Sequence, residues 1–543
     1  MDPTIKHLVD TWQQFAACIS KHPDKLLHTQ SAYWQDYLVL CQEIENISPM
    51  QIENWQQHTA FHFIKKSHAL LSHHIQQLIN NITSGESNKI AKKLQFYAKQ
   101  FIDALSPNNF ANTNPDIIAR TMEVNGGNFI SGMKQFLADL EQGESILNIT
   151  STDPHYFKIG ENIACTKGYV IYQNDLMQLI QYSPTTEKTY QYPLLIIPPW
   201  INKYYILDLQ QENSLVKWLV DQGLTVFMIS WVNPTQEHRE KSFSHYMQQG
   251  PLAAMRVIKQ QTKTMNINLL GYCIGGTLLG CTLAYLAKKQ DHRVQSATFL
   301  TTLFDFSEPG DLGNFIDENQ LAILENKMKT DGYLDGKILS AIFNLLRAND
   351  LIWSAFVNQY LKGQKPKPFD LLYWNADCTN IPEKVHRFYL RNMYLYNYLV
   401  QPNKIKLAGV AIDLNWVTTP SYFLAAQDDH IVPWRSSYKS SQCFSGPVKF
   451  VLTASGHVAG VVNPPVRNKY CYWTNTKKYK KPENYLASAV LKQGSWWNDW
   501  IGWLKKHAGE WQSAERIRQG ETNFIEEAPG SYVKVRLSTP LSS

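Results

Sequence analysis

The chain has 543 residues, of which 44% are hydrophobic and 18% are charged. The charged fraction lies below the ~25% of an average soluble protein, and the composition excludes disordered, collagen-like and acidic solvating chains. The formal net charge of +6 is spread over the whole length, so it gives no indication of nucleic acid, and we expect none as a partner.

The eight cysteines form no C-x-x-C pair, and charged residues near the N-terminus replace the pattern of a cleavable signal. Both features favour a reducing cytoplasm. The longest stretch without a charged side chain, residues 264–287, is long enough to cross a bilayer. Glycines and asparagines interrupt it in the pattern of a buried strand, a tight turn and a buried helix. We therefore expect no transmembrane segment.

Residues 1–155 are expected to form a mostly helical N-terminal domain. Apolar residues recur there at helical spacing, as at Leu8, Trp12 and Phe15. The predicted helix around 90–105 also carries lysines around its polar face. This basic amphipathic pattern has two interpretations, a helix lying on an apolar particle or membrane and a solvated face packed on its own core.

From about residue 160 the apolar pattern becomes that of β-strands, and helical segments lie between most of them. Such alternation predicts a mostly parallel sheet covered on both faces. We expect strands at 169–172, 177–182, 194–197, 225–230, 266–270, 297–302, 422–426 and 449–452.

The interval between the predicted strands 297–302 and 422–426 is too long for a simple connection in a compact domain. It is rich in aromatic residues, as expected of a segment that covers a pocket. We therefore predict an inserted cap at about 303–420, within a catalytic domain of residues 156–543.

The sharpest local pattern is GYCIGG at residues 271–276, between a hydrophobic strand and an apolar helix. It matches the nucleophile elbow of the α/β-hydrolase fold, with Cys273 in the place of serine. Glycines two residues before and after the nucleophile let strand and helix approach, and a helix N-terminus favours a thiolate. A buried structural cysteine is the other interpretation of this pattern alone.

The partners of the nucleophile are expected in the chain order acid, then histidine. Asp429 follows the predicted strand 422–426, and His457 follows the strand 449–452. His430, next to Asp429, is a rival base. The order predicts an α/β-hydrolase fold in which Cys273, Asp429 and His457 form the catalytic group, with the cap inserted between Cys273 and Asp429.

Longer segments of the chain match a known enzyme family. They are PPWINKYYILDL at 198–209, GYCIGG at 271–276, QDDHIVPW at 427–434, SGHVAGVVNPP at 455–465, GSWW at 494–497 and APGSYVK at 528–534. On these segments the chain resembles the class I polyhydroxyalkanoate synthases over most of its length. The resemblance implies Cys273 as the acyl-carrying nucleophile, His457 as the general base and Asp429 as the carboxylate beside it.

The resemblance also implies an acyltransferase that polymerises (R)-3-hydroxyacyl-CoA, with 3-hydroxybutyryl-CoA as the expected substrate, and releases CoA. A thiolate exchanges one thioester for another, so the acyl group stays activated for the next step. His457 is expected to activate both the thiol and the 3-hydroxyl of a second unit, while Asp429 either orients the imidazole or shares in that activation. No metal or organic cofactor is expected, because CoA is the leaving group of the substrate.

Other residues are candidates for stabilising or binding the substrate. The backbone N–H of Ile274 and one in the loop after residues 198–199, at Trp200 or Ile201, are expected to form an oxyanion hole. The substrate-binding candidates are His430, Arg391 and Trp374. A structural ion pair and a core position are the alternatives for Arg391 and Trp374, respectively.

Two other functions fit the same residues: a cysteine-dependent ester or thioester hydrolase, and a granule-coating protein whose catalytic group is idle. Polymer together with free CoA would distinguish the polymerase from a hydrolase, which yields free hydroxy acid. The resemblance further implies a homodimer in the cytoplasm at the surface of polyester granules. Granule-associated proteins are then its partners, and the N-terminal helices are candidates for binding the granule.

Overall fold

The computed structural model describes residues 3–45, 59–84, 88–143, 149–518 and 524–537. They form two compact units, the first within 1–153 and 341–367 and the second within 154–340 and 368–538. Residues 341–367 belong to the first unit although they fall within the expected cap interval. The division into domains 1–155 and 156–543 stays a prediction.

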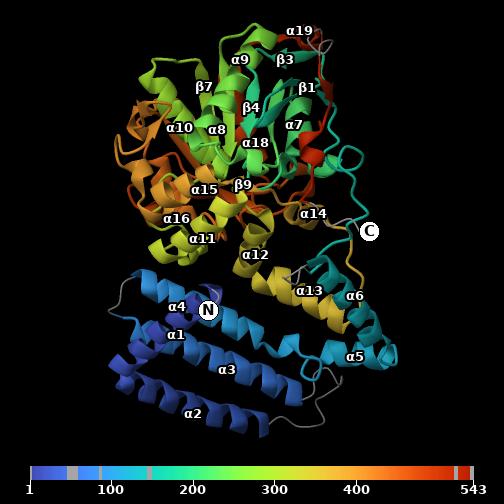
Figure 1. The fold of residues 1–543 in the computed structure, drawn as a ribbon, viewed down its shortest axis with the longest axis vertical. Helices are drawn as coiled ribbons and strands as arrows, with labels where there is room; N and C mark the ends of the chain where they lie inside the picture. Colours follow the sequence, from blue (N-terminus) through green and yellow to red (C-terminus); the bar gives the residue numbers. More distant parts are fainter. Residues whose placement is uncertain (1–2, 46–58, 85–87, 144–148, 519–523, 538–543) are drawn as a thin grey trace. The chain divides into compact units, whose positions relative to one another are not determined.

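The first unit is helical, as expected for the N-terminal part of the chain (Figure 1). Its core includes Cys18, Ile79, Ile82 and Leu94. Segment 357–361 packs closely against the α6 helix (Gly127–Gly143) at Gly132. A Cβ at this glycine would lie only 1.9 Å from the Tyr360 carbonyl oxygen. The helices before the catalytic unit are α1 (Pro3–Lys21), α2 (Pro23–Glu45), α3 (Thr59–Ile82), α4 (Asn88–Ala104), α5 (Pro115–Glu123) and α6 (Gly127–Gly143).

The second unit contains an 11-stranded sheet in the order β15-β14-β13-β12-β7-β6-β4-β5-β2-β1-β17. All the strands expected from the sequence are present, with ends shifted by a few residues. The sheet is parallel only in its middle, from β5 to β13, and antiparallel at both ends. Its strands are β1 (Gly168–Gln173), β2 (Met177–Tyr182), β4 (Leu194–Ile197), β5 (Val226–Trp231), β6 (Ile267–Tyr272), β7 (Val294–Leu300), β12 (Ser421–Ala426), β13 (Val448–Thr453), β14 (Cys471–Thr474), β15 (Val490–Gln493) and β17 (Glu526–Glu527).

Helices cover both faces of this sheet, which is the α/β arrangement expected from the sequence. The tryptophan-rich helix α18 (Trp497–Leu504) packs with α7 (Leu215–Asp221) in one buried cluster. Helices α9 (Pro251–Thr262), α10 (Ile274–Lys288) and α16 (Trp434–Ser441) pack on sheet strands outside that cluster, and α8 (Phe243–Gln249) packs against α9 and α10. In the described ranges no helix is both long and apolar enough to span a membrane.

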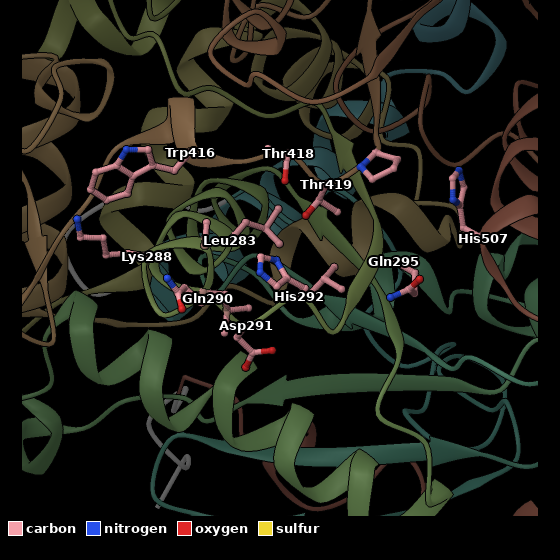
Figure 2. A pocket seen from close by; sticks show the side chains of 14 residues that line it. Leu283, Lys288, Gln290, Asp291, His292, Gln295, Trp416, Thr418, Thr419 and His507 are labelled. Atoms are coloured by element: carbon pink, nitrogen blue, oxygen red, sulfur yellow. The ribbon is translucent and has the colours of Figure 1, made fainter.

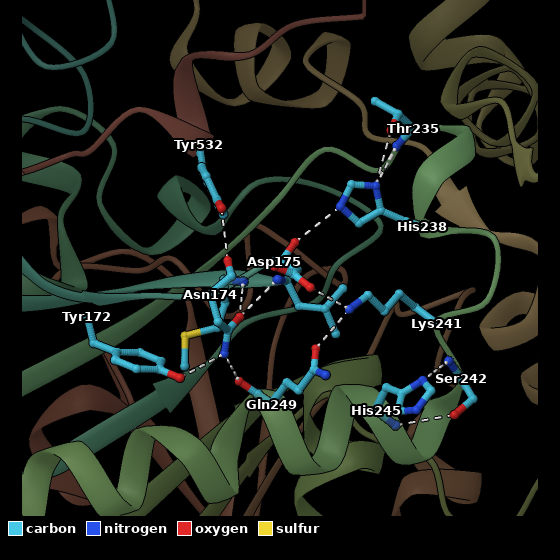
Figure 3. Close-up of polar contacts among 12 residues, drawn as sticks. Tyr172, Asn174, Asp175, Thr235, His238, Lys241, Ser242, His245, Gln249 and Tyr532 are labelled. Carbon is cyan, nitrogen blue, oxygen red and sulfur yellow. Dashed lines mark hydrogen bonds and ion pairs between the residues drawn. The ribbon is translucent and has the colours of Figure 1, made fainter.

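The turn between β1 and β2 is tied to the C-terminal segment of the chain (Figure 3). The Asn174 side chain accepts hydrogen bonds from the N–H groups of Leu176 and Met177, at 2.9 and 3.0 Å, and so closes the turn. The Tyr532 hydroxyl donates to the Asn174 carbonyl at 2.8 Å. The APGSYVK motif therefore anchors the chain end to the β1–β2 hairpin.

The interval between β7 and β12 is mostly helical, with two short antiparallel strand pairs. It contains α11 (Glu318–Asp331), β8 (Tyr333–Leu334), α12 (Gly336–Leu346), α13 (Ser354–Phe356), α14 (Asp370–Ala376), β9 (Ile381–Pro382), α15 (Glu383–Tyr389), β10 (Lys406–Leu407) and β11 (Val410–Ala411). Elsewhere lie β3 (Lys188–Tyr190), α17 (Pro482–Ala487), β16 (Trp511–Ser513) and α19 (Glu515–Arg518).

Candidate active site

Cys273 occupies the sharp turn between β6 and α10. Its backbone has φ 52° and ψ −123°, a conformation that costs a non-glycine residue free energy and marks a nucleophile elbow. The side chain is partly accessible, at the N-terminus of α10, where the helix dipole favours a thiolate.

Two glycines of the GYCIGG motif make this turn possible by their lack of a side chain. A Cβ at Gly271 would lie 2.5 Å from the Gly276 Cα, and a Cβ at Gly275 would lie 2.3 Å from the Ile197 carbonyl oxygen. Both contacts are with backbone atoms, which cannot move aside as a side chain can. The strand, the helix and the end of β4 therefore meet around Cys273 only because these positions are glycines.

His457 and Asp429 lie together beside Cys273. The His457 Nδ1 is 2.6 Å from the Asp429 Oδ2, and the Cys273 side chain is close enough to act electrostatically on the imidazole. Tyr272 stacks on the imidazole, with ring centroids 5.6 Å apart, and its hydroxyl donates to the His457 carbonyl. The structure therefore brings together the three residues that were singled out from the sequence.

The carboxylate of Asp429 is itself held in place. Its Oδ1 accepts hydrogen bonds from the backbone N–H groups of Ile431 and Val432, at 2.9 and 2.8 Å. Asp429 is buried, whereas the neighbouring Asp428 is exposed. The loop after β12 thus turns one of two adjacent carboxylates inward and leaves the other in solvent.

The surroundings of His457 favour the charged form of its imidazole. Burial opposes the charged form of His457, but the Asp429 carboxylate and the Cys273 sulfur favour it, and together they raise the pKa of His457 above its ordinary value. A raised pKa lets the His457 imidazole hold a proton beside the Asp429 carboxylate.

The loop after β4 runs along the N-terminus of α10. The Trp231 indole donates to the Pro198 carbonyl at 2.9 Å, and Gly275 lies against the same carbonyl group. Among the described residues none accepts a hydrogen bond from the backbone N–H of Ile201 or Ile274. Donors without an acceptor are what an oxyanion hole requires, although the assignment of these two groups stays a prediction.

The three substrate-binding candidates are placed differently. Trp374 is buried in the core, and its indole donates to the Lys203 carbonyl at 2.7 Å. Arg391 forms ion pairs with Glu325 and Glu318, at 2.5 and 3.1 Å. His430 is half-buried beside Asp429, and its carbonyl accepts a hydrogen bond from the backbone of residue 311. Their roles in substrate binding stay predictions.

Two tyrosines of the cap were not singled out from the sequence but lie close to Cys273. The rings of Tyr389 and Tyr394 are 5.4 Å apart, and both also contact Phe306. Burial and the nearby charge of Cys273 raise the pKa of Tyr394 above its ordinary value. Only the folding of the cap onto the sheet brings these phenols to Cys273, because no local sequence pattern links them to it.

The GSWW motif supports the loop that carries His457. The indoles of Trp496 and Trp497 are fully buried and donate to the carbonyls of Gly460 and Val461, at 3.0 and 2.9 Å. These hydrogen bonds fix the backbone just after His457, so the motif acts on the site from the α18 helix.

A separate hollow lies at the end of the sheet where the parallel strands begin (Figure 2). It is lined by Val294, where β7 begins, and by Pro420, just before β12. Cys273 instead follows the carboxyl end of β6, which runs parallel to β7. The hollow and the candidate active site are therefore at opposite ends of the parallel strands.

The fold and the site define the class of protein. A mixed sheet with a strained Cys273 beside His457 and Asp429 is that of an α/β-hydrolase-fold enzyme, and the family profile for the α/β hydrolase fold matches residues 192–464. The profile for the N-terminus of poly-beta-hydroxybutyrate polymerase (PhaC) matches residues 49–219.

Curated relatives specify the family further. The chain is 47% identical to the poly(3-hydroxyalkanoate) polymerase subunit PhaC of Rhizobium etli, over 89% of this chain and 76% of that one. It is 41% identical to a poly(3-hydroxyalkanoate) polymerase of Methylorubrum extorquens, over 99% and 90% of the two chains. The identity to the Cupriavidus necator subunit PhaC is 38%, over 95% and 89%. The chain belongs to the poly(3-hydroxyalkanoate) polymerase family, which confirms the resemblance seen in its motifs.

Proposed function

We propose that this enzyme polymerises (R)-3-hydroxyacyl-CoA, with 3-hydroxybutyryl-CoA as substrate, through a covalent acyl group on Cys273. The observation that carries the proposal is the contact of a cysteine at a nucleophile elbow with the buried His457–Asp429 pair. Membership of the polymerase family supports the choice of substrate class.

In the first step the Cys273 thiolate attacks the thioester carbonyl, and His457 holds the thiol proton. The oxyanion that forms is stabilised by the N–H groups of Ile274 and Ile201. When the carbon–sulfur bond to CoA breaks, the CoA thiolate takes the proton from His457 and leaves as the free thiol. The acyl group remains on Cys273 as a thioester of similar energy.

In the second step the 3-hydroxyl group of a second 3-hydroxyacyl unit attacks the acyl-Cys273 thioester. His457 takes the hydroxyl proton and then returns it to the departing Cys273 sulfur. Asp429 holds the imidazole by the 2.6 Å contact and stabilises its positive charge. An ester bond forms as the thioester bond breaks, so each cycle lengthens the chain by one unit and needs no cofactor.

Water would turn the same intermediate into a free hydroxy acid, which is the hydrolase alternative. Of the cap tyrosines close to Cys273, Tyr389 is buried and Tyr394 is half-buried. An aromatic cover that keeps water from the intermediate favours transfer to a hydroxyl over hydrolysis.

The experiment is incubation with (R)-3-hydroxybutyryl-CoA, measuring released thiol, free 3-hydroxybutyrate and polymer. Polymer in proportion to CoA supports the proposal, and free acid in that proportion identifies a hydrolase. The absence of both in the wild-type enzyme would contradict the enzyme proposal and favour the granule-coating alternative.

We further propose that the enzyme works as a homodimer in the cytoplasm, at the granule surface. Two of the relatives are named as polymerase subunits, which supports an assembly with other proteins. Light scattering after size-exclusion chromatography tests the dimer, and co-sedimentation with polyester particles tests the location.

A further inference from the structure

The oxyanion loop, residues 198–203, is bound along its far side by a segment of the cap, residues 374–380. The Lys203 ammonium is 2.7 Å from the Asp377 carboxylate, and these side chains are only 3% and 4% exposed. The Tyr205 hydroxyl donates to the same carboxylate at 2.8 Å. The Trp374 indole donates to the Lys203 carbonyl. Side chains of both segments therefore join the loop to the cap.

Thr379 makes the contact nearest to the expected oxyanion donor. Its buried hydroxyl donates a shared hydrogen bond to the carbonyls of Trp200 and Ile201, at 2.8 Å each. The Thr379 N–H also points to the Ile201 carbonyl, at 3.4 Å. One cap residue thus binds two consecutive peptide groups of the loop.

The Trp200 carbonyl and the Ile201 N–H belong to one peptide group. That group is planar and trans, so its oxygen and its hydrogen point in opposite directions. A hydrogen bond that holds the oxygen on the cap side therefore also aims the Ile201 N–H. At the other end of the loop, the Trp231 indole holds the Pro198 carbonyl. The short stretch between these two anchors has little freedom to rotate.

Stability alone does not account for the Lys203–Asp377 pair. Burying two charges costs free energy that their attraction repays only when the geometry is good, and apolar replacements are often neutral or stabilising. A buried pair does, however, define one position for the segments that it joins. That position places Thr379 against the loop.

We propose that Thr379 is a positioning residue for acyl transfer, which aims the Ile201 N–H at the developing oxyanion, and that the Lys203–Asp377 pair keeps it in register. The inference rests on the proposed function of Cys273. It makes the cap part of the acyl-transfer machinery, in addition to its role as a cover.

The test compares Thr379→Val, which removes the hydroxyl at nearly constant shape, with Thr379→Ser, which keeps it. Removing one oxyanion donor typically lowers kcat by ~10²–10³, and a misdirected donor should cost less. We expect kcat for CoA release to fall about 10- to 100-fold in Thr379→Val with KM within about twofold, and to recover most of its value in Thr379→Ser. Thr262→Val, which loses a buried hydroxyl donor to the Ile258 carbonyl in α9, is the matched control.

A second measurement separates positioning from a loss of structure. Iodoacetamide alkylates the Cys273 thiolate at a saturated carbon, where no oxyanion develops, and mass spectrometry reports the rate at this cysteine. We expect alkylation and thermal unfolding of Thr379→Val to match those of the wild type. An unchanged kcat in Thr379→Val, an equal loss in Thr379→Ser, or a parallel loss of alkylation would overturn the proposal.

Failure of the proposed function is recognised in the wild-type enzyme, as an absence of CoA release from 3-hydroxybutyryl-CoA. Acylation of Cys273 by p-nitrophenyl acetate then tests Thr379 separately, because every acyl transfer to this sulfur passes through an oxyanion. A burst equal in wild type and Thr379→Val would refute the role of Thr379, and a slower burst restored in Thr379→Ser would support it.

Discussion

The chemical difference between two cysteines of the same apolar stretch comes from their surroundings. Cys281 lies inside α10 and is fully buried, and burial raises its pKa to about 12, so it stays a neutral thiol. Cys273 sits at the helix N-terminus, close enough to the His457 imidazole for the two groups to interact electrostatically. Backbone position and one neighbour therefore separate the proposed nucleophile from a core residue.

We predict that Cys273→Ala abolishes CoA release, whereas Cys281→Ala keeps most of it. Cys273 lies beside the His457–Asp429 pair, whereas Cys281 is buried inside α10. Mass spectrometry after a short incubation with substrate should find the acyl group on Cys273. Adducts confined to another cysteine would contradict the assignment.

The two adjacent aspartates should also behave differently. We expect Asp429→Asn to slow elongation by at least about 100-fold, because the carboxylate supports an imidazolium while a hydroxyl of high pKa is activated. Acylation should suffer less, since a thiol is already partly ionised near neutral pH. Asp428→Asn, at an exposed position, should be mild on both steps. Single-turnover CoA release and polymer formation measure the two steps, and a halt of elongation in Asp428→Asn alone would show that the carboxylate is misassigned.

Segments outside the loops of the candidate site hold those loops by side-chain hydrogen bonds. The α18 helix binds the backbone after His457 through its tryptophans, and the cap segment before α15 binds the oxyanion loop through Thr379. The lysine-bearing helix α4 instead packs Leu94 into the core of the first unit. Its exposed lysines are consistent with a solvated face, and its contact with granules stays a prediction.

We predict that Trp497→Phe destabilises the protein by about 0.5–1.5 kcal/mol, because the Val461 carbonyl loses one hydrogen bond but keeps those from Trp496 and the Asn463 N–H. The loop after His457 should loosen, so kcat should fall more than stability alone explains. Trp511→Phe is the matched control, since Trp511 is 50% exposed. Urea unfolding and CoA release are the measurements, and equal effects of the two substitutions would argue against a supporting role of α18.

Acid should weaken the cap at α15. Burial lowers the pKa of His386 to about 4, so below pH 6.5 the unfolded chain binds a proton that the folded chain does not. Stability must then fall as the pH falls, by about 2 kcal/mol between pH 7 and pH 5 for this group. His386→Leu should remove that part of the pH dependence, measured as the shift of the urea midpoint. An unchanged pH dependence would show that His386 is not the responsible group.

The sheet of the second unit is completed by a strand from the end of the chain. β17 pairs with β1, and the Glu526 carboxylate binds Gln178 and Ser531. The edge strand β15 at the opposite end is exposed along its length. One edge is therefore covered by the C-terminal segment, while the other is left open.

We predict that deletion of residues 524–543 lowers the melting temperature by roughly 5 °C or more and promotes aggregation, because it uncovers the β1 edge. Deletion of residues 538–543 alone is the control and should have little effect. Thermal unfolding and light scattering measure the two outcomes. Equal stability of both deletions would show that β17 is dispensable.

Local pattern was sufficient for the elements around the site. The alternation of strands and helices predicted the α/β class, and the glycines around Cys273 predicted a turn that the backbone at φ 52° confirms. The chain order of Asp429 and His457 placed both after neighbouring strands, which the parallel register of β12 and β13 brings to one edge. These features depend on side-chain periodicity and on residues close in the chain, so they can be read directly.

Contacts between distant segments could not be read in this way. The antiparallel strands β14, β15 and β17 are short, and their pairing depends on neighbours far along the chain. Three further features likewise depend on which segments pack together. They are the burial of Asp429 in preference to Asp428, the ion pairs of Arg391 and the hydrogen bonds of Thr379 to the oxyanion loop. Long-range packing chooses among side chains that are locally equivalent, because burial and hydrogen-bond partners are properties of the assembled fold.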